Sequence, residues 1–349
     1  MHVRLNLKRS LKVNLLFQTV LPWAECPSIV INGTQTIPVP ECEMSSETSY
    51  FWYREALDIS PSIDAFDGIR WWMLISLAIA WIVVYLIIMK GIQSSGYVVY
   101  FTALFPYVVL TVFLVRGLTL PGSFAGIHHM LNPKVDMLLN PGVWLDAANQ
   151  VFFSYGLAFG SIISFGSYNA PNTNCVRDVY LLTACNIFTA LYACGVIFGI
   201  LGFKAQHLFE KCLHRDLDLI FAHTDVWHGK VVEDITVEEY TGLMTSHVMN
   251  DTLINQVFTG ENALKNCSLE EYLNEAAEGT GLAFIVMADV FTKLPGAPFW
   301  SVLFFTMLLS LGLGSQIGIL EGMIATLFDI PSLKSIPKPL LTGMFFYCI

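Results

Sequence analysis

The sequence predicts an all-α protein that spans a lipid bilayer. Of its 349 residues, 54% are hydrophobic and only 13% are charged, whereas about a quarter of the residues in a soluble domain carry charge. The hydrophobic residues form uninterrupted blocks, and several of these reach the about 20 residues that a helix needs to cross the hydrocarbon core. Lipid is therefore the expected solvent for most of the chain, and helices are the expected elements.

Residues 1–70 are expected to hold a truncated or replaced amino terminus followed by an external loop. No signal peptide is recognisable, because the apolar stretch 13–23 that follows the basic residues 1–12 is short and contains two amide side chains. At the other end of the chain, the apolar run 340–349 is too short to cross a bilayer. We expect a truncated helix there.

Four spanning helices are expected in residues 71–205 and a fifth in residues 299–349. The clearest is 71–89, an uncharged block that opens with two tryptophans suited to the membrane interface. The others are at least as long and are also apolar, although the third carries several polar residues. The five predicted spans are 71–89, 97–115, 143–165, 179–203 and 299–328.

The segment 206–298 is too long and too mixed in charge to be a simple connection, so we expect a large external lobe. Within it, residues 279–295 are apolar but short, which favours a re-entrant helix over a span. Much of the acid behind the net charge of −10 lies in this segment and is expected on a solvated surface. Because no basic stripe is present, nucleic acid is not an expected partner.

Glycosylation sequons indicate which loops are external. Asn32 precedes the first span, and Asn250 and Asn266 lie in the long lobe. Four predicted spans separate the two regions, so both fall on the same side. A weak excess of lysine and arginine in the opposite loops agrees with this orientation.

The cysteines fit the same orientation. Cys26 and Cys42 frame the external segment that holds the first sequon, and a bridge between them is the favoured pairing. Cys212 and Cys267 lie in the external lobe, where oxidation is also allowed. Three others lie in apolar blocks and are expected to be small buried hydrophobic residues: Cys185, Cys194 and Cys348.

The third span has two interpretations. It carries Asp146, Asn149, Gln150 and Ser154, and these polar groups need partners inside a membrane. One interpretation is a discontinuous helix, unwound at residues 154–160, that exposes backbone groups to an ion and a substrate. The other is close helix packing through small residues, with hydroxyls bonded to their own backbone.

The second and fifth spans leave similar alternatives open. Glu321, in the fifth, is either a proton or cation site or a structurally paired charge. In the second, Gly96 and Pro106 mark either a hinge or a simple bend.

Motifs along nearly the whole chain resemble those of the neurotransmitter:sodium symporter family. They occur in the family's order: LPWAEC (21–26), RGLTLPG (116–122), WLDAANQVFFSYG (144–156), SYN (167–169), GTGLAFIV (279–286), PFWSVLFFTMLLSLGLGS (298–315) and EG (321–322). Within the family, YFWYREALDIS (50–60), KNCSLE (265–270) and EGTGLAFIV (278–286) look most like the epithelial B0-type neutral amino-acid transporters and the related imino-acid (proline) transporter.

This resemblance implies the inverted-repeat fold of the bacterial leucine transporter, with this chain covering helices four to eight and the start of nine. It implies a multi-pass plasma-membrane protein, not an enzyme, that carries small neutral or imino acids with Na⁺ by alternating access. A single-pass accessory subunit of the collectrin type is implied as well. Because the family's first helix supplies the other half of each sodium site, we expect the chain alone to be inactive. The alternative is a truncated form that binds or regulates a full-length transporter.

The resemblance also assigns site residues. It places Phe153, Ser154, Phe159, Ser315, Gln316 and Ile319 around the substrate. It assigns one sodium to Ser154 and Asn186, and a second to the Leu311 carbonyl and the Ser315 hydroxyl. Oxygen ligands suit such a hard cation.

Two departures from the family pattern concern ions. Gln150, Ser154 and Asn186 match part of the family's chloride site, but its usual serine is Ala190 here, which leaves chloride dependence undecided. Gly314 stands where some relatives place an acidic ligand for the second sodium. The resemblance also gives Gly96 and Pro106 the spacing of the hinge that opens the inner path.

Overall fold

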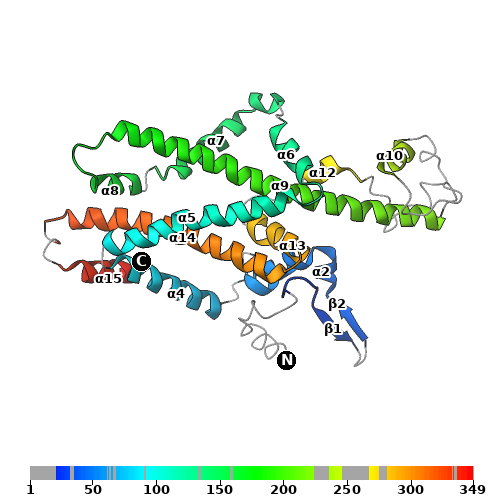
Figure 1. The fold of residues 1–349 in the computed structure, drawn as a ribbon. Coiled ribbons are helices and arrows are strands. Elements are labelled where there is room, and N and C mark those ends of the chain that lie inside the picture. Colours follow the sequence, from blue (N-terminus) through cyan, green and yellow to red (C-terminus); the bar gives the residue numbers. More distant parts are fainter. Residues whose placement is uncertain are drawn as a thin grey trace. The chain divides into compact units, whose positions relative to one another are not determined.

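The computed structural model describes residues 21–348 except 32–34, 61, 63, 66–67, 90–91, 133–134, 158–159, 224–235, 246–266, 275–280, 332 and 334–335. The described part is helical apart from one short hairpin, in agreement with an all-α membrane protein (Figure 1). The chain divides into two compact units. Unit 1 comprises residues 1–114, 133–193 and 279–349, and unit 2 comprises residues 115–132 and 194–278.

The described part of unit 1 begins with a hairpin followed by short helices. Strands β1 (Ser28–Ile31) and β2 (Gln35–Pro38) form an antiparallel hairpin in which Ser28 pairs with Pro38. The short helices α2 (Pro40–Met44), α3 (Glu47–Tyr50) and η2 (Phe51–Ala56) follow. The structure joins Cys26 to Cys42, the pairing that the sequence favours, and so closes the hairpin at its base.

This segment packs on η7 (Leu282–Val286) and α13 (Met287–Thr292). The Trp23 indole N–H donates to the carbonyl of Ala288 at 3.3 Å. The rings of Trp52 and Phe284 stack with their centroids 4.3 Å apart. The two short helices within the predicted re-entrant stretch are therefore held by aromatic side chains from the start of the chain.

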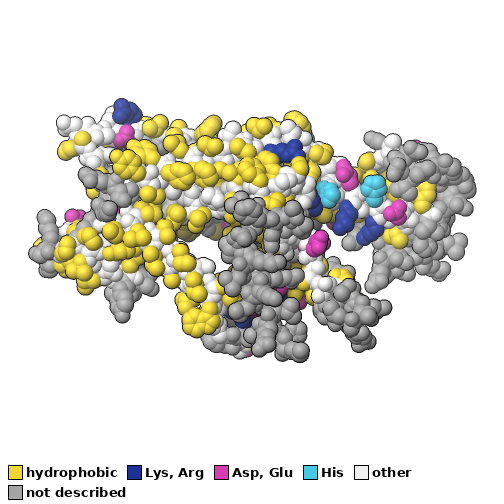
Figure 2. Space-filling view, turned by 60° about the horizontal axis from the view of Figure 1, so that its bottom comes forward, with side chains coloured by type: hydrophobic (Ala, Val, Ile, Leu, Met, Phe, Trp, Pro, Cys, Tyr) yellow, Lys and Arg dark blue, Asp and Glu magenta, His cyan; other side chains and the backbone are white. Residues whose placement is uncertain are grey.

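The structure describes four helices that are long and apolar enough to cross a membrane. They are α4 (Trp71–Ile88), α5 (Ile92–Leu118), α9 (Cys175–His223) and α14 (Ala297–Phe328). Large hydrophobic side chains cover much of the surface of the long helices (Figure 2). Such a surface is expected to face lipid or further helices and not water.

Helix α14 is at the centre of the unit 1 core. Its residues Ile317, Leu320 and Ile324 pack with Val84 and Ile88 of α4 in one buried cluster. α15 (Lys338–Cys348) packs on the same C-terminal half of α4, where the Tyr85 hydroxyl donates to the carbonyl of Pro339 at 3.3 Å.

The third predicted span is interrupted. α7 (Pro141–Ser154) ends at the position where unwinding was expected, and α8 (Ser161–Ser167) begins after it (Figure 1). Gly156 and Gly160 have φ angles of 61° and 76°, a left-handed backbone conformation that residues with a Cβ rarely adopt. The discontinuous helix is therefore present, and the two glycines make it possible.

Helix α9 differs from the predicted span 179–203, because it continues without a break to His223. Its 49 residues extend for about 70 Å, more than twice the hydrocarbon thickness. The predictions for Cys185 and Cys194 were wrong, since both side chains are exposed on α9. The side chain of Cys348 lies outside the described residues.

Unit 2 is built on the second half of α9. α6 (Ser123–Leu131) crosses it at a close approach of two glycines, Gly126 and Gly202. Further along, α10 (Val237–Thr245) and α12 (Leu269–Asn274) cover a buried cluster that includes Leu217 and Ile220 of α9. In unit 1, the short helix η3 (Val135–Leu139) directly precedes α7.

Candidate ion and substrate site at the helix break

The candidate site centres on the break between α7 and α8. Asn140 caps the start of α7, where its side chain accepts from the amide of Gly142 at 2.9 Å, and Pro141 is the first residue of the helix. At its other end, the amide of Gly156 bonds the carbonyl of Phe153 at 3.0 Å and closes the last turn. A helix end leaves carbonyl oxygens without intrahelical partners, and these carry a partial negative charge. The break thus supplies oxygen atoms suited to a cation.

Ser154 and Asn186 meet across two helices at this break. The Ser154 hydroxyl donates to the amide oxygen of Asn186 at 2.8 Å, although the two residues are far apart in sequence. The hydroxyl gives away its proton, so its lone pairs remain available to a ligand. The structure thus brings together both residues expected at the first sodium.

The neighbouring residues on α7 are accessible. Gln150 is exposed and lies four residues before Ser154, so both share one face of the helix. The Phe153 side chain is 62% exposed and contacts the ring of Phe152 edge-on. Phe159 lies outside the described residues.

The second set of expected residues lies on α14. Leu311 and Ser315 are exposed, while Gln316 and Ile319 are half-buried. α8 packs on the same helix, because a Cβ at Gly318 would lie 3.5 Å from the Phe165 ring. Among the described residues, no hydrogen bond joins this set to Ser154 or Asn186.

Gly314 faces α5 at short range. A Cβ at this position would lie 3.2 Å from the hydroxyl oxygen of Thr102, which is buried. A larger side chain at residue 314 would require the Thr102 side chain to shift by a few tenths of an ångström. The glycine therefore fits a close contact between α14 and α5.

Glu321 is buried and accepts a hydrogen bond. The residue is 1% exposed, and the Tyr168 hydroxyl donates to its Oε1 at 3.2 Å. A hydrogen-bonded partner inside the protein lowers the cost of burying the group. The tyrosine is neutral and bonds only one of the two carboxylate oxygens, so the contact does not decide between a structural role and a proton or cation site for Glu321.

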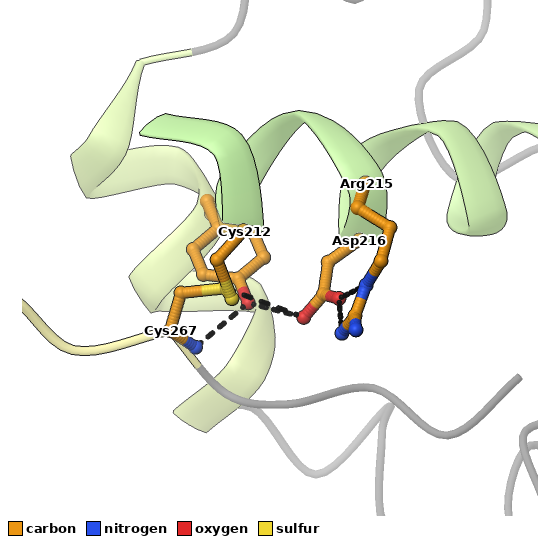
Figure 3. The surroundings of a disulfide bond; sticks show 5 residues. Cys212, Arg215, Asp216 and Cys267 are labelled. Atoms are coloured by element: carbon orange, nitrogen blue, oxygen red, sulfur yellow. Dashed lines mark hydrogen bonds and ion pairs between the residues drawn. A yellow bond between two sulfur atoms is a disulfide. The ribbon is translucent and has the colours of Figure 1, made fainter. Parts of the chain in front are cut away.

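Sequence reasoning did not find the network in unit 2 (Figure 3). Cys212 is bonded to Cys267, and beside them Asp216 is fully buried and pairs with Arg215 at 2.5 Å. The Tyr240 hydroxyl donates to Asp216 at 3.0 Å and accepts from the Cys267 amide at 3.3 Å. Burial, assisted by the Asp216 charge, raises the pKa of Tyr240 above its ordinary value.

This network joins three segments of unit 2. Its role is structural. Cys212, Asp216 and Cys267 bring potential metal-ligand atoms within 4.8 Å of one another. The disulfide, however, occupies both sulfurs. The only signal in the sequence was the presence of two cysteines in one predicted external lobe.

The chain is similar to known proteins over nearly its whole length. The model of the sodium:neurotransmitter symporter family matches residues 12–348. The chain belongs to this family. It is 44% identical over 344 residues to the sodium-dependent neutral amino acid transporter B(0)AT2 of Mus musculus, across 95% of this chain and 46% of the relative.

Two other relatives show a similar match. The sodium-dependent neutral amino acid transporter SLC6A17 of Rattus norvegicus is 45% identical over 334 residues, 93% of this chain and 45% of the relative. The inactive sodium-dependent neutral amino acid transporter B(0)AT3 of Homo sapiens is 43% identical over 329 residues, 94% of this chain and 51% of the relative. The chain spans about half the length of these relatives, which are named as transporters and not as enzymes.

Proposed function

We propose that this chain forms part of a sodium-coupled symporter of neutral amino acids in the plasma membrane. Membership of the symporter family gives the class of activity. The observation that carries the proposal is the hydrogen bond between Ser154 and Asn186 at the break of a spanning helix. Broken helices with polar side chains are the usual place for ions and substrates in such transporters.

The first sodium binds at this break. The Ser154 hydroxyl and the Asn186 amide oxygen are neutral oxygen donors of the kind that a hard cation prefers. Their hydrogen bond holds them close together before the ion arrives. The second sodium uses the Leu311 carbonyl and the Ser315 hydroxyl on α14. The half of the relatives' length that this chain does not cover supplies the remaining ligands of both sites.

The amino acid binds beside these ions. The substrate-lining residues are Phe153, Ser154, Phe159, Ser315, Gln316 and Ile319. They are aromatic, apolar or neutral, which suits an uncharged side chain, and both B(0)AT2 and SLC6A17 are named as neutral amino acid transporters. An imino acid such as proline fits the same description. Alternating access opens the inner path by bending α5 between Gly96 and Pro106.

Chloride has a smaller part in the proposal. Gln150, Ser154 and Asn186 offer hydrogen-bond donors, but Ala190 contributes no hydroxyl one turn after Asn186. We therefore expect transport to depend strongly on Na⁺ and weakly on Cl⁻. Asn32, Asn250 and Asn266 are proposed glycosylation sites, and they lie outside the described residues. A collectrin-type single-pass subunit is the proposed accessory partner.

A second candidate function is that of a regulator without transport of its own. The human relative B(0)AT3 is named inactive, so members of this kind without transport exist. In that case the chain binds a full-length transporter and changes its activity.

The test begins with full-length transcripts from the source tissue, which show whether further helices are joined to this region. Uptake of radiolabelled leucine and proline is then measured in cells that express the resulting protein, with and without Na⁺. Replacement Ser154→Ala is expected to raise the Na⁺ concentration for half-maximal uptake at least severalfold. The matched control is Ser76→Ala on α4, whose hydroxyl bonds only its own helix at Trp72.

Sodium-independent uptake, or an unchanged sodium dependence in the Ser154 variant, would overturn the proposed site. No uptake by the longest natural product, together with altered uptake by a co-expressed relative, would favour the regulator instead.

A further inference from the structure

Helices α5 and α9 are joined by two reciprocal hydrogen bonds that the proposed transport site does not use. The Tyr107 hydroxyl of α5 meets the Thr189 hydroxyl of α9 at 2.5 Å. The Tyr192 hydroxyl of α9 donates to the Thr111 hydroxyl of α5 at 2.8 Å. Each helix thus provides one tyrosine and one threonine.

The protons of this arrangement can be assigned without ambiguity. The Thr189 hydroxyl donates to the carbonyl of Cys185, and the Thr111 hydroxyl donates to the carbonyl of Tyr107, both at 2.7 Å. Each threonine has a single proton, so each must accept from its tyrosine. All four hydroxyl protons are therefore used, and a sliding motion of one helix along the other would break both tyrosine bonds together.

Pro106 separates the part of α5 that carries these bonds from the part before it. Proline has no amide proton, so the usual bond to the carbonyl four residues earlier, that of Thr102, is absent. After Pro106, the buried Phe113 also contacts the rings of Phe291 and Phe304, at 5.5 and 6.0 Å between centroids. Helix α5 is thus weakened at one point and firmly attached beyond it.

Before Pro106, the attachment of α5 has a different character. Val98 and Val99 lie against the apolar cluster of α4 and α14. The Thr102 hydroxyl donates to the Val99 carbonyl of its own helix at 3.2 Å. Apolar contacts are not directional, so they tolerate small shifts better than hydrogen bonds do.

We propose that the Tyr107–Thr189 and Tyr192–Thr111 hydrogen bonds lock the part of α5 after Pro106 to α9, so that this part stays in place when α5 bends between Gly96 and Pro106. The four side chains are positioning residues and contact no proposed ligand. The inference rests on the proposed transport function for its purpose, since a transport cycle needs such a bend. The lock itself is a property of the chain and can be measured without transport.

The test is amide hydrogen exchange, followed by mass spectrometry, on the purified 349-residue chain in lipid nanodiscs without Na⁺ or amino acid. Residues 107–114 are expected to exchange more slowly than residues 95–105. The double variant Tyr107→Phe with Tyr192→Phe is expected to speed exchange in 107–114 about tenfold. This is about threefold per bond, the equivalent of the ~0.6 kcal/mol average for hydrogen bonds between membrane helices. Exchange in 95–105 should change by less than twofold.

The matched control replaces Tyr100 and Tyr180 with phenylalanine, one on each helix, both 73% exposed. A second pair, Thr111→Val with Thr189→Val, removes the acceptors at nearly constant shape and should act in the same direction. Equal exchange in the two parts of α5, or a Tyr107/Tyr192 variant that behaves like the control, overturns the proposal. So does a loss of all helicity in both pairs, since the bonds would then support the whole fold and not one part of α5.

Because no ligand is present in this experiment, its outcome is separate from that of the uptake assay. A lock without uptake would leave the proposed function wrong and the inference right.

Discussion

The close contact of α6 with α9 gives a sharp prediction about stability. Replacement of Gly126 by alanine would place a Cβ 2.8 Å from the Cα and amide nitrogen of Gly202, and closer still to the carbonyl oxygen of Phe198. These are backbone atoms, so no side chain can rotate away. We expect Gly126→Ala to destabilise unit 2.

The size of the effect follows from the contact. Ordinary carbon contacts lie at about 3.5–4.0 Å, so α6 has to move away from α9 by roughly 1 Å. Overpacking of this kind costs about 1–3 kcal/mol. Against this, alanine gains up to about 1 kcal/mol over glycine as a helix former. With the full gain in helix propensity, the net loss is therefore expected at about 0–2 kcal/mol, and the loss relative to a clash-free Gly→Ala replacement at about 1–3 kcal/mol.

Gly195→Ala is the matched control on α9, because a Cβ there would meet nothing within 4 Å. This variant keeps the gain in helix propensity without the clash, and should be stabilised by up to about 1 kcal/mol. Thermal unfolding in nanodiscs, together with hydrogen exchange of residues 123–131, measures both variants. A Gly126→Ala protein as stable as Gly195→Ala would refute the close approach of the two helices.

Three further predictions concern the network around Asp216 in unit 2. Tyr240→Phe should lower the free energy of unfolding by about 1–3 kcal/mol, because it removes a hydrogen bond to a buried carboxylate. Urea unfolding monitored in unit 2 measures the loss. Tyr53→Phe, at a half-exposed position of unit 1, is the control. Because the pKa of Tyr240 is raised in the folded state, its contribution should be complete below the unfolded pKa of about 10 and lost as pH rises toward the folded value. Melting temperatures between pH 8 and 11 should therefore fall more steeply for the natural chain than for Tyr240→Phe, and parallel curves would contradict this. Replacing Cys212 and Cys267 by serine should lower the free energy of unfolding by about 4 kcal/mol, because in the chain-entropy account the disulfide closes a loop with separation 55. The same replacement of Cys26 and Cys42, with separation 16, should lower it by about 3 kcal/mol. Equal losses of thermal stability in the two double variants would count against that account.

The candidate site was partly predictable because its signals are local. Polar residues and glycines in the third apolar block predict a break, and the left-handed Gly156 and Gly160 carry it in the structure. The meeting of Ser154 with Asn186 was expected only through the family resemblance. Composition alone does not say which faces of two helices meet.

The length of α9 could not be predicted from the local sequence pattern. Hydropathy falls after residue 203, where the predicted span ended, yet the helix continues to His223. Leu217 and Ile220 in the added part are buried against Tyr240 and Cys267. Packing against segments remote in sequence therefore stabilises the part of α9 that extends beyond the predicted membrane span.

The sequence by itself determined that this is a helical membrane protein, because the transfer of long apolar blocks into lipid depends on composition and length alone. It also determined where the third span breaks, since glycine conformations are a local property. Only the tertiary structure decided which side chains pair across elements, such as Tyr107 with Thr189, Tyr168 with Glu321 and Cys212 with Cys267. Hydrogen bonds and disulfides depend on distances of a few ångströms between residues far apart in the chain, and those distances are fixed only when the helices are packed.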